Sequence, residues 1–326
     1  MSFLCCCGKN PVEEEISCPH VTRQKATESV NEHKLPQGVI LSGGSKLHQQ
    51  GLTGTNVRVA VIDSGIDMDH PGFHGQVKKQ IWLRSGTPLE EDDHGTHVAG
   101  TIHLMAPKAD IYDYRVFGRN GKLGVNEAIA KAIQDATDEG CHVINMSLGA
   151  PFPTPSIHSA VKNAVSKGVV VVCAAGNEGD NNPLTNELSY PAAHEECISV
   201  AAVSKKDGFP VAVFSNSNAQ VDYASIGVDV TSFKPGGGYQ IMSGTSMACP
   251  HVAGLIACLM TNGKTKAESI RKKLNELSID IGTEGIDNAT GIGFVTYLEE
   301  EAFDEVLPRG SIAGGKTKEM YSAVVS

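Results

Sequence analysis

The sequence has little that would suit a nucleic acid or a membrane. Its 326 residues carry a formal net charge of -10. No basic patch of the kind that contacts phosphates is present, so we expect no nucleic-acid partner. No apolar run is long enough to span a bilayer, so we expect no transmembrane segment either. With 40% hydrophobic and 20% charged residues, the chain instead has the composition of an ordinary globular protein.

Export signals and disulfide pairs are also not evident. The stretch from Met1 to Lys9 has no basic leader, no full apolar core and no small-residue cleavage site. The number of cysteines is odd, at nine, and five of them lie in apolar or Ala-rich segments, as free buried thiols commonly do: Cys141, Cys173, Cys197, Cys249 and Cys258. We therefore expect an intracellular, cytoplasmic protein without disulfides.

The two ends of the chain differ from its middle. Residues 1–34 are polar and lack sustained periodicity, so we interpret them as an N-terminal extension. Residues 302–326 are polar and Gly-rich and are expected to form a mobile C-terminal tail. The remainder, residues 35–301, is long enough to form one large domain.

Three consecutive cysteines, Cys5, Cys6 and Cys7, stand inside the extension. They suggest a site of S-acylation, although incidental surface cysteines would give the same sequence. N-myristoylation is not expected, because Ser2 stands where that modification needs a glycine.

Apolar runs and helical patterns alternate through the middle of the chain. Four nearly continuous apolar runs are predicted strands, and the segments between them have helical character. The runs are 57–62, 141–146, 168–175 and 197–203, and the helical segments are 94–105, 124–139 and 155–167. Such a pattern predicts an α/β fold, a three-layer sandwich whose mostly parallel central sheet is covered by helices on both faces. Its ligand site should lie beyond the carboxyl ends of the strands.

A turn and a buried helix near the end of the domain carry a candidate nucleophile. Ser246 stands just before the apolar segment 252–260, which predicts a helix. Unpaired N–H groups at a helix start can face a developing anion. Pro250 is expected in the first turn, where a residue without an N–H is tolerated. A serine in this position is more often a plain N-cap, so a catalytic role depends on partners elsewhere.

Three polar residues could be those partners. Asp63 ends the first apolar run, His94 begins an apolar helix, and Asn177 follows the run 168–175. Each has an ordinary explanation as a turn or surface residue. All three nevertheless fall where an α/β sheet gathers its ligand site, and the amide of Asn177 could donate to an oxyanion. The order Asp63, His94, Ser246 is also one of the triad orders that distinguish the serine-protease folds.

The motifs around these residues resemble those of the subtilisin-like serine proteases (subtilases), with a layout closest to the intracellular subtilisins. The motifs are Val59-Ala60-Val61-Ile62-Asp63-Ser64-Gly65-Ile66, His94-Gly95-Thr96-His97-Val98-Ala99-Gly100, Ala174-Ala175-Gly176-Asn177-Glu178-Gly179 and Gly244-Thr245-Ser246-Met247-Ala248 through Gly254. The resemblance covers about residues 36–300. It implies a serine endopeptidase in which Ser246 is the nucleophile, His94 the general base and Asp63 its orienting carboxylate, with Asn177 in the oxyanion hole.

The resemblance also implies a channel for a peptide or protein substrate. Two segments would flank an extended peptide and pair with its backbone, and a third would wall the principal pocket. The flanking segments are Ser147, Leu148, Gly149 and Lys122, Leu123, Gly124, and the pocket wall is Ala174, Ala175, Gly176. The small wall residues predict broad specificity with a preference for large apolar residues before the scissile bond. Glu178 at the rim would also accept Lys or Arg.

Two departures from the family pattern affect cofactors and activation. Gly72 stands where many secreted relatives have a calcium-binding Asp, and the helix after His94 continues through 105–107 without an inserted Asn-rich loop. We therefore expect this strong calcium site to be missing and no cofactor to be required for activity. A calcium site elsewhere in the chain is compatible with this expectation. About 34 residues precede the family-like part, instead of a long prodomain. They are expected to form a short inhibitory pro-segment.

Other functions remain open at this point. A transpeptidase or ligase on the same scaffold would use an amine to resolve the acyl-enzyme. A protease-like binding protein without activity is a second alternative, although all four catalytic candidates are kept. A lipase-type hydrolase is disfavoured, because Ser246 lacks the Gly-x-Ser-x-Gly elbow and His94 precedes it. No motif specifies an oligomeric state.

Overall fold

The computed structural model describes residues 22–24, 35–85, 92–118, 121, 123–206 and 208–299. The helices are α1 (Gln37–Leu41), α2 (Gly44–Gln49), α4 (His94–Met105), α5 (Val125–Asp138), α6 (Pro155–Ser166), α7 (Thr245–Leu259) and α8 (Ile270–Glu276), with short 3-10 helices η1 (Pro71–Phe73), η2 (Thr261–Gly263) and η3 (Ala267–Ser269). The strands are β1 (Thr22–Gln24), β2 (Arg58–Asp63), β3 (Val77–Trp82), β4 (Asp110–Arg115), β5 (Val143–Met146), β6 (Val170–Ala174), β7 (Ile198–Val203), β8 (Tyr223–Ile226), β9 (Val230–Phe233), β10 (Tyr239–Ser243), β11 (Ser278–Ile279) and β12 (Phe294–Val295). Cys5, Cys6, Cys7, Lys122 and the segment 302–326 lie outside the described residues.

A nine-stranded sheet forms the centre of the molecule, in the order β11-β12-β8-β7-β6-β5-β2-β4-β3. Its neighbours pair in parallel except for β11 and β12. The four predicted strands are β2, β5, β6 and β7, and they lie side by side in the middle of the sheet. Their apolar runs are continuous because both faces are buried: Val59 and Val61 join one core cluster, whereas Ala60 and Ile62 join the other.

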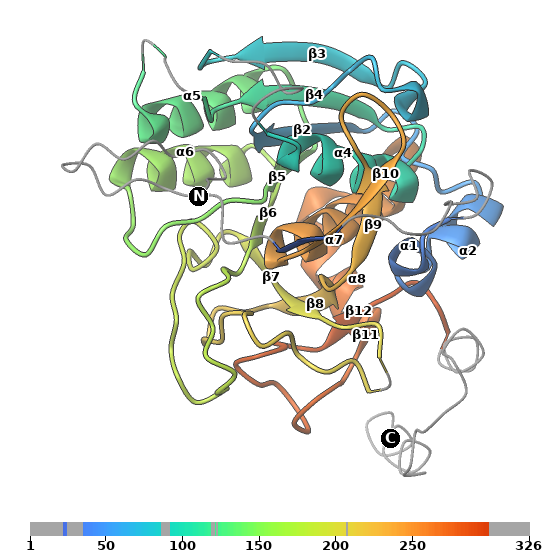
Figure 1. Cartoon of the computed structure of the whole chain (residues 1–326), viewed down its shortest axis with the longest axis vertical. Helices are drawn as coiled ribbons and strands as arrows, with labels where there is room; N and C mark the ends of the chain where they lie inside the picture. The colour runs from blue at the N-terminus through green and yellow to red at the C-terminus, as the bar shows by residue number, and fades with distance from the viewer. Residues whose placement is uncertain are drawn as a thin grey trace.

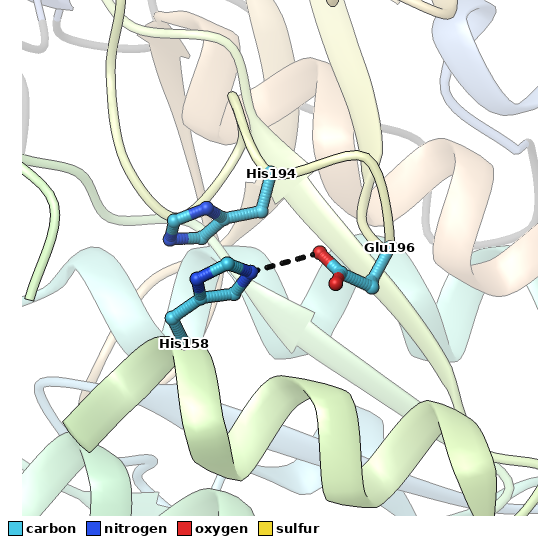
Figure 2. Close-up of side chains that lie close together, drawn as sticks. All are labelled: His158, His194 and Glu196. Carbon is cyan, nitrogen blue, oxygen red and sulfur yellow. Dashed lines mark hydrogen bonds and ion pairs between the residues drawn. The ribbon is translucent and has the colours of Figure 1, made fainter. Parts of the chain in front are cut away.

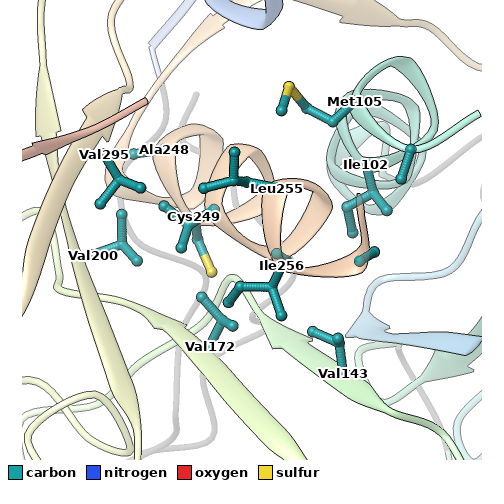
Figure 3. Packing of buried hydrophobic residues seen from close by; sticks show 14 of the residues in the cluster. Ile102, Met105, Val143, Val172, Val200, Ala248, Cys249, Leu255, Ile256 and Val295 are labelled. Atoms are coloured by element: carbon teal, nitrogen blue, oxygen red, sulfur yellow. The ribbon is translucent and has the colours of Figure 1, made fainter. Parts of the chain in front are cut away.

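Helices cover both faces of the sheet, which confirms the three-layer architecture (Figure 1). The helices α5 and α6 pack on one face and contribute to the smaller core cluster. The helices α4 and α7 lie on the other face, where α7 crosses the central strands. Figure 3 shows this second core, with Ile256 and Cys249 of α7 above Val172 and Val143 of the sheet. The predicted helices 94–105, 124–139 and 155–167 correspond to α4, α5 and α6.

The helix α7 begins earlier than the sequence predicts. It starts at Thr245, so Pro250 is its sixth residue and lies beyond the first turn. The expectation for Pro250 is therefore wrong. Because proline has no N–H, the carbonyl group of Ser246 has no intrahelical donor four residues later. The Ser147 hydroxyl donates to that carbonyl oxygen instead, at 2.9 Å, which compensates for the missing helical bond.

A second, three-stranded sheet stands beside α4. The hairpin of β9 and β10 forms two of its strands, and β1 adds the third, antiparallel to β10. None of these three strands is predicted from the sequence. For β1 the reason is that its partner strand lies more than two hundred positions away in the chain. The pairing joins the N-terminal extension to the strand that leads into α7.

The five cysteines in the described part of the chain are buried free thiols, as their apolar surroundings predict. Of the helices that the structure describes, none combines the length and the apolar composition needed to cross a bilayer.

Candidate active site

Three adjacent strands end at the same edge of the sheet and deliver polar residues there. Asp63 is the last residue of β2, Ser147 follows β5, and Asn177 lies three residues beyond the end of β6. Because β2, β5 and β6 are neighbours and parallel, their carboxyl ends converge. The start of α7, with Ser246, meets the same edge through its hydrogen bonds to Ser147.

Asp63 and His94 form a buried hydrogen-bonded pair. His94 is the first residue of α4, and its backbone N–H donates to Asp92 Oδ1 at 2.9 Å. Its Nδ1 lies 2.8 Å from Asp63 Oδ1, and both side chains are fully buried. A carboxylate can only accept here, so Nδ1 carries the proton and Nε2 is the basic nitrogen of the neutral ring.

A glycine allows α4 to approach the loop that follows Asp63. The Gly95 N–H donates to Ser64 Oγ at 3.0 Å. A Cβ atom at Gly95 would lie 2.4 Å from the carbonyl oxygen of Gly65, a fixed backbone atom. Any larger residue would therefore push the start of α4 away and lengthen the distance between His94 and Asp63.

Ser246 is held by reciprocal hydrogen bonds with Ser147. The Ser246 hydroxyl donates to the Ser147 carbonyl oxygen at 3.2 Å, and the Ser147 hydroxyl donates back to the Ser246 carbonyl oxygen at 2.9 Å. Below them, Asn145 Nδ2 donates to Ser147 Oγ at 3.0 Å, and the Cys249 thiol lies 3.2 Å from Asn145 Oδ1. Asn145 is not among the residues predicted from the sequence, although a lone polar residue in an apolar strand is a usable signal.

The amide of Asn177 has a fixed orientation. Its Oδ1 accepts hydrogen bonds from the backbone N–H and the hydroxyl of Thr245, both at 2.8 Å. An N–H can only donate, so the oxygen is the atom that faces Thr245 and the NH₂ group lies on the other side of the amide. Thr245 immediately precedes Ser246, so Asn177 is anchored beside the start of α7.

The predicted substrate segments lie at the ends of the same strands. Ser147 and Leu148 follow β5 and are buried. Gly149 packs closely against Ser189, where a Cβ would come within 2.2 Å of Ser189 Oγ. Ala150, the next residue, exchanges two backbone hydrogen bonds with Tyr190. The segment 147–150 is thus fixed against the connection between β6 and β7.

The remaining predicted substrate residues have backbone anchors of their own. Ala174 ends β6, and Ala175 donates its N–H to the Val200 carbonyl at 3.0 Å. Gly176 follows with a left-handed backbone, φ +113°. Leu123 and Gly124 precede α5, and Gly124 is its N-cap. The described members of this set are therefore positioned by the end of β6 and the start of α5.

Glu178, at the predicted rim of the pocket, is exposed. Its Oε2 accepts a hydrogen bond from Asn216 Nδ2 at 2.9 Å, and its own backbone N–H donates to Asn216 Oδ1. The carboxylate is therefore held in place while it remains accessible to solvent.

A second buried carboxyl, Asp113 of β4, lies behind the loop that follows Asp63. Its Oδ2 accepts the backbone N–H of Ile66 at 3.1 Å and the side-chain amide of Gln80 at 3.0 Å. The Trp82 indole N–H contributes a longer contact at 3.3 Å. Burial raises the pKa of Asp113 to about 7, and the charge of nearby Asp63 acts in the same direction. Asp113 is not predicted from the sequence, because the segment that forms β4 has a polar pattern.

Comparison with known protein families gives one match over most of the chain. The model described as "Subtilase family" matches residues 54–293. The "Major intracellular serine protease" of Bacillus subtilis (strain 168) is 37% identical over 282 residues, which cover 80% of this chain and 84% of that protein. The "Intracellular serine protease" of Paenibacillus polymyxa is 36% identical, with coverage of 85% and 89%. "Subtilisin E" of Bacillus subtilis (strain 168) is 35% identical, with coverage of 84% and 72%.

Proposed function

The chain belongs to the subtilase family and is a serine endopeptidase, and on this premise we propose that Ser246, His94 and Asp63 form its catalytic triad. Ser246 Oγ attacks the carbonyl carbon of the scissile bond and forms an acyl-enzyme, while His94 Nε2 takes the hydroxyl proton and later gives it to the leaving amine. The buried hydrogen bond between His94 Nδ1 and Asp63 carries this assignment, because it selects the tautomer that the reaction needs.

Two donors would stabilise the tetrahedral oxyanion. These are the NH₂ group of Asn177 and the backbone N–H of Ser246 at the start of α7. The anchored Oδ1 of Asn177 supports this role, because it holds the NH₂ group without reorganisation when charge develops.

One experiment tests the triad and separates the alternative functions. The full chain and a version starting at residue 35 are incubated with a peptide library, beside Ser246→Ala in both. Mass spectrometry should find hydrolysis products that disappear with Ser246→Ala, and a serine-directed phosphonate should label Ser246. Ligated products would favour a transpeptidase, and neither cleavage nor labelling in the shorter version would favour an inactive binding protein.

The small residues at the end of β6 support a roomy specificity pocket. Ala174, Ala175 and Gly176 offer little side-chain volume, so large apolar residues before the scissile bond should be accepted. The exposed carboxylate of Glu178 should also accept Lys or Arg. Cleavage of the library should follow this pattern, and Glu178→Gln should selectively reduce cleavage after basic residues. Strict selectivity for acidic residues or glycine would contradict the proposed pocket.

The N-terminal segment 1–34 is proposed to restrain activity. The pairing of β1 with β10 supports this idea, because Thr22 lies opposite Ser243, three residues before Ser246. An extended peptide that adds to a sheet edge gains main-chain hydrogen bonds and fills space that a substrate would need. The arm would thus compete with substrate beside the nucleophile.

Shortening or unpairing the arm should therefore raise activity. The version starting at residue 35 should hydrolyse peptides faster than the full chain. Arg23→Pro should also be activating, because proline disturbs strand pairing, and Arg23→Ala is the matched control. Equal rates for the full and shortened chains would refute the proposal.

The calcium site of the secreted relatives does not fit this chain. Gly72 offers no side-chain oxygen, and a Cβ atom there would lie 2.4 Å from Cζ of Phe233, so a calcium-binding Asp would require that ring to shift. His70 stacks on that ring, with centroids 4.3 Å apart, and so limits such a shift. The side chains of the triad need no cofactor for the reaction.

The protein is proposed to be intracellular and to reside in the cytoplasm. Two of the similar proteins are named as intracellular proteases, which supports this location. Cell fractionation tests it, and recovery from the culture medium of intact cells would contradict it. S-acylation at Cys5, Cys6 or Cys7 is a further proposal. Metabolic labelling with an alkyne fatty acid should be lost when all three are changed to Ser.

A further inference from the structure

Two histidines and a glutamate meet between α6 and the connection that leads from β6 to β7, and none of them belongs to the proposed triad. His158 comes from α6, whereas His194 and Glu196 come from the connection between β6 and β7 (Figure 2). His158 Nε2 lies 3.1 Å from Glu196 Oε2. One ligand atom from each residue can be chosen so that all three lie within 4.8 Å of one another. Within the described ranges, this is the group with the donors to hold a metal ion.

His194 is the buried member of this group. The residue is 8% exposed, and its Nε2 is buried with no hydrogen-bond partner among the described residues. A buried ring nitrogen without a partner is costly, so its presence calls for a physical explanation. Neutral imidazole is the form that binds metals.

The two imidazole rings are stacked, with centroids 3.6 Å apart and planes 4° from parallel. The in-plane lone pairs of parallel rings do not converge, so one ring must turn about its Cβ–Cγ bond before both can bind one ion. His158 can turn, because its side chain is 31% exposed. Ligand atoms around tetrahedral zinc lie about 3.4 Å apart, so the group must also contract by about 1.4 Å from its widest spacing.

We propose that His158, His194 and Glu196 bind one divalent metal ion of the zinc, nickel and copper class. Two imidazoles and one carboxylate suit these ions. They do not suit calcium, which takes six to eight oxygen ligands. Lys162 Nζ lies 3.7 Å from Glu196 Oε1, and this ammonium group is exposed enough to move aside when a metal replaces it.

Metal binding here would strengthen a junction that the hydrogen bond from His158 to Glu196 and the ion pair from Lys162 to Glu196 already form. The ion would link α6 to the connection between β6 and β7. The ring of Tyr190 lies 4.9 Å from that of His194, and the Tyr190 backbone is bonded to Ala150 in the proposed substrate segment. Because the ion binds the folded arrangement of all three ligands, it should stabilise the protein against unfolding.

The test uses the full chain with Ser246→Ala, which prevents self-digestion, after removal of bound metals. Isothermal titration with Zn²⁺ should show one more bound equivalent in this parent than in the same protein with His158→Ala. Glu196→Gln preserves the shape of the side chain and should reduce the affinity for that zinc equivalent at least about tenfold. Glu195→Gln, at the exposed neighbouring position, is the matched control and should change nothing. Thiols elsewhere in the chain contribute equally to parent and variants.

A thermal measurement gives the second readout. At a Zn²⁺ concentration about one hundred times Kd, the Tm of the parent should rise by about 5 °C, and that rise should vanish with His158→Ala. Calcium at the same concentration should not reproduce it through these residues. If His158→Ala and Glu196→Gln bind as many zinc equivalents as the parent, with the same Tm shift, the site does not exist. Circular dichroism verifies that both variants are folded.

Discussion

The buried carboxyl of Asp113 should make stability depend on pH near neutrality, and Asp113→Asn isolates this effect. Burial raises its pKa in the folded protein to about 7, compared with 3.8 for an ordinary aspartate. Between these two values the native state keeps the proton, whereas the unfolded chain has lost it. The free energy of unfolding therefore falls as pH rises from about 4 to about 7, and this contribution is constant above pH 7.

The size of the effect follows from the same pKa difference. One unit of pKa is worth about 1.4 kcal/mol, so ionising Asp113 lowers the free energy of unfolding by about 4 kcal/mol over the whole range. The amide oxygen of the substituted side chain can still accept from Ile66, Gln80 and Trp82 but carries no charge. Its NH₂ group replaces Oδ1 of Asp113, a buried atom without a hydrogen-bond partner in the described structure. That change costs about 1–3 kcal/mol at every pH.

The diagnostic quantity is consequently the pH dependence of the difference between variant and parent. Guanidinium unfolding is measured at pH 5 and pH 8, with Ser246→Ala in both proteins. From pH 5 to pH 8, the stability of Asp113→Asn relative to the parent should rise by about 3 kcal/mol. Asp69→Asn, at an exposed position, should show no such change. Parallel curves for Asp113→Asn and the parent would mean that Asp113 is ionised well below neutral pH, and the reasoning would fail.

Three further predictions concern the active site, calcium and an ion pair. Asn177→Leu should reduce kcat about 10²–10³-fold with little change in KM, because the lost donor acts only in the transition state; an equal rise in KM would assign Asn177 to substrate binding instead. Since Gly72 offers no side-chain oxygen to calcium, the Tm of metal-free protein should be the same within about 1 °C with and without added calcium. A large increase would reveal another calcium site. Arg271→Met should lower the free energy of unfolding by about 1–2 kcal/mol, because it removes a 2.6 Å ion pair with Asp222 that is only partly shielded from solvent. Denaturant curves that coincide with those of the parent would show that solvent compensates fully for the lost pair.

Local sequence was sufficient for the central strands and the helices around them. A parallel strand buried on both faces needs consecutive apolar residues, so β2 can be recognised from Val57 to Ile62 without knowing its partners. The same logic predicts α4 and the placement of Asp63 and His94 at the same edge of the sheet. The structure adds the hydrogen bond between them, which depends on the close approach of Gly95 to Gly65.

Features that depend on distant pairing were decided only by the tertiary structure. The strand β1 has no pattern of its own and exists through its pairing with β10. Pro250 is tolerated inside α7 because Ser147 donates to the carbonyl that proline leaves unpaired. Asp113 belongs to a polar-looking strand, and its raised pKa comes from the burial that packing imposes. His158 and His194 are separated in the sequence by β6, and only the fold stacks their rings. Apolar periodicity is local and readable in a sequence, whereas burial of a polar group depends on every element that packs around it.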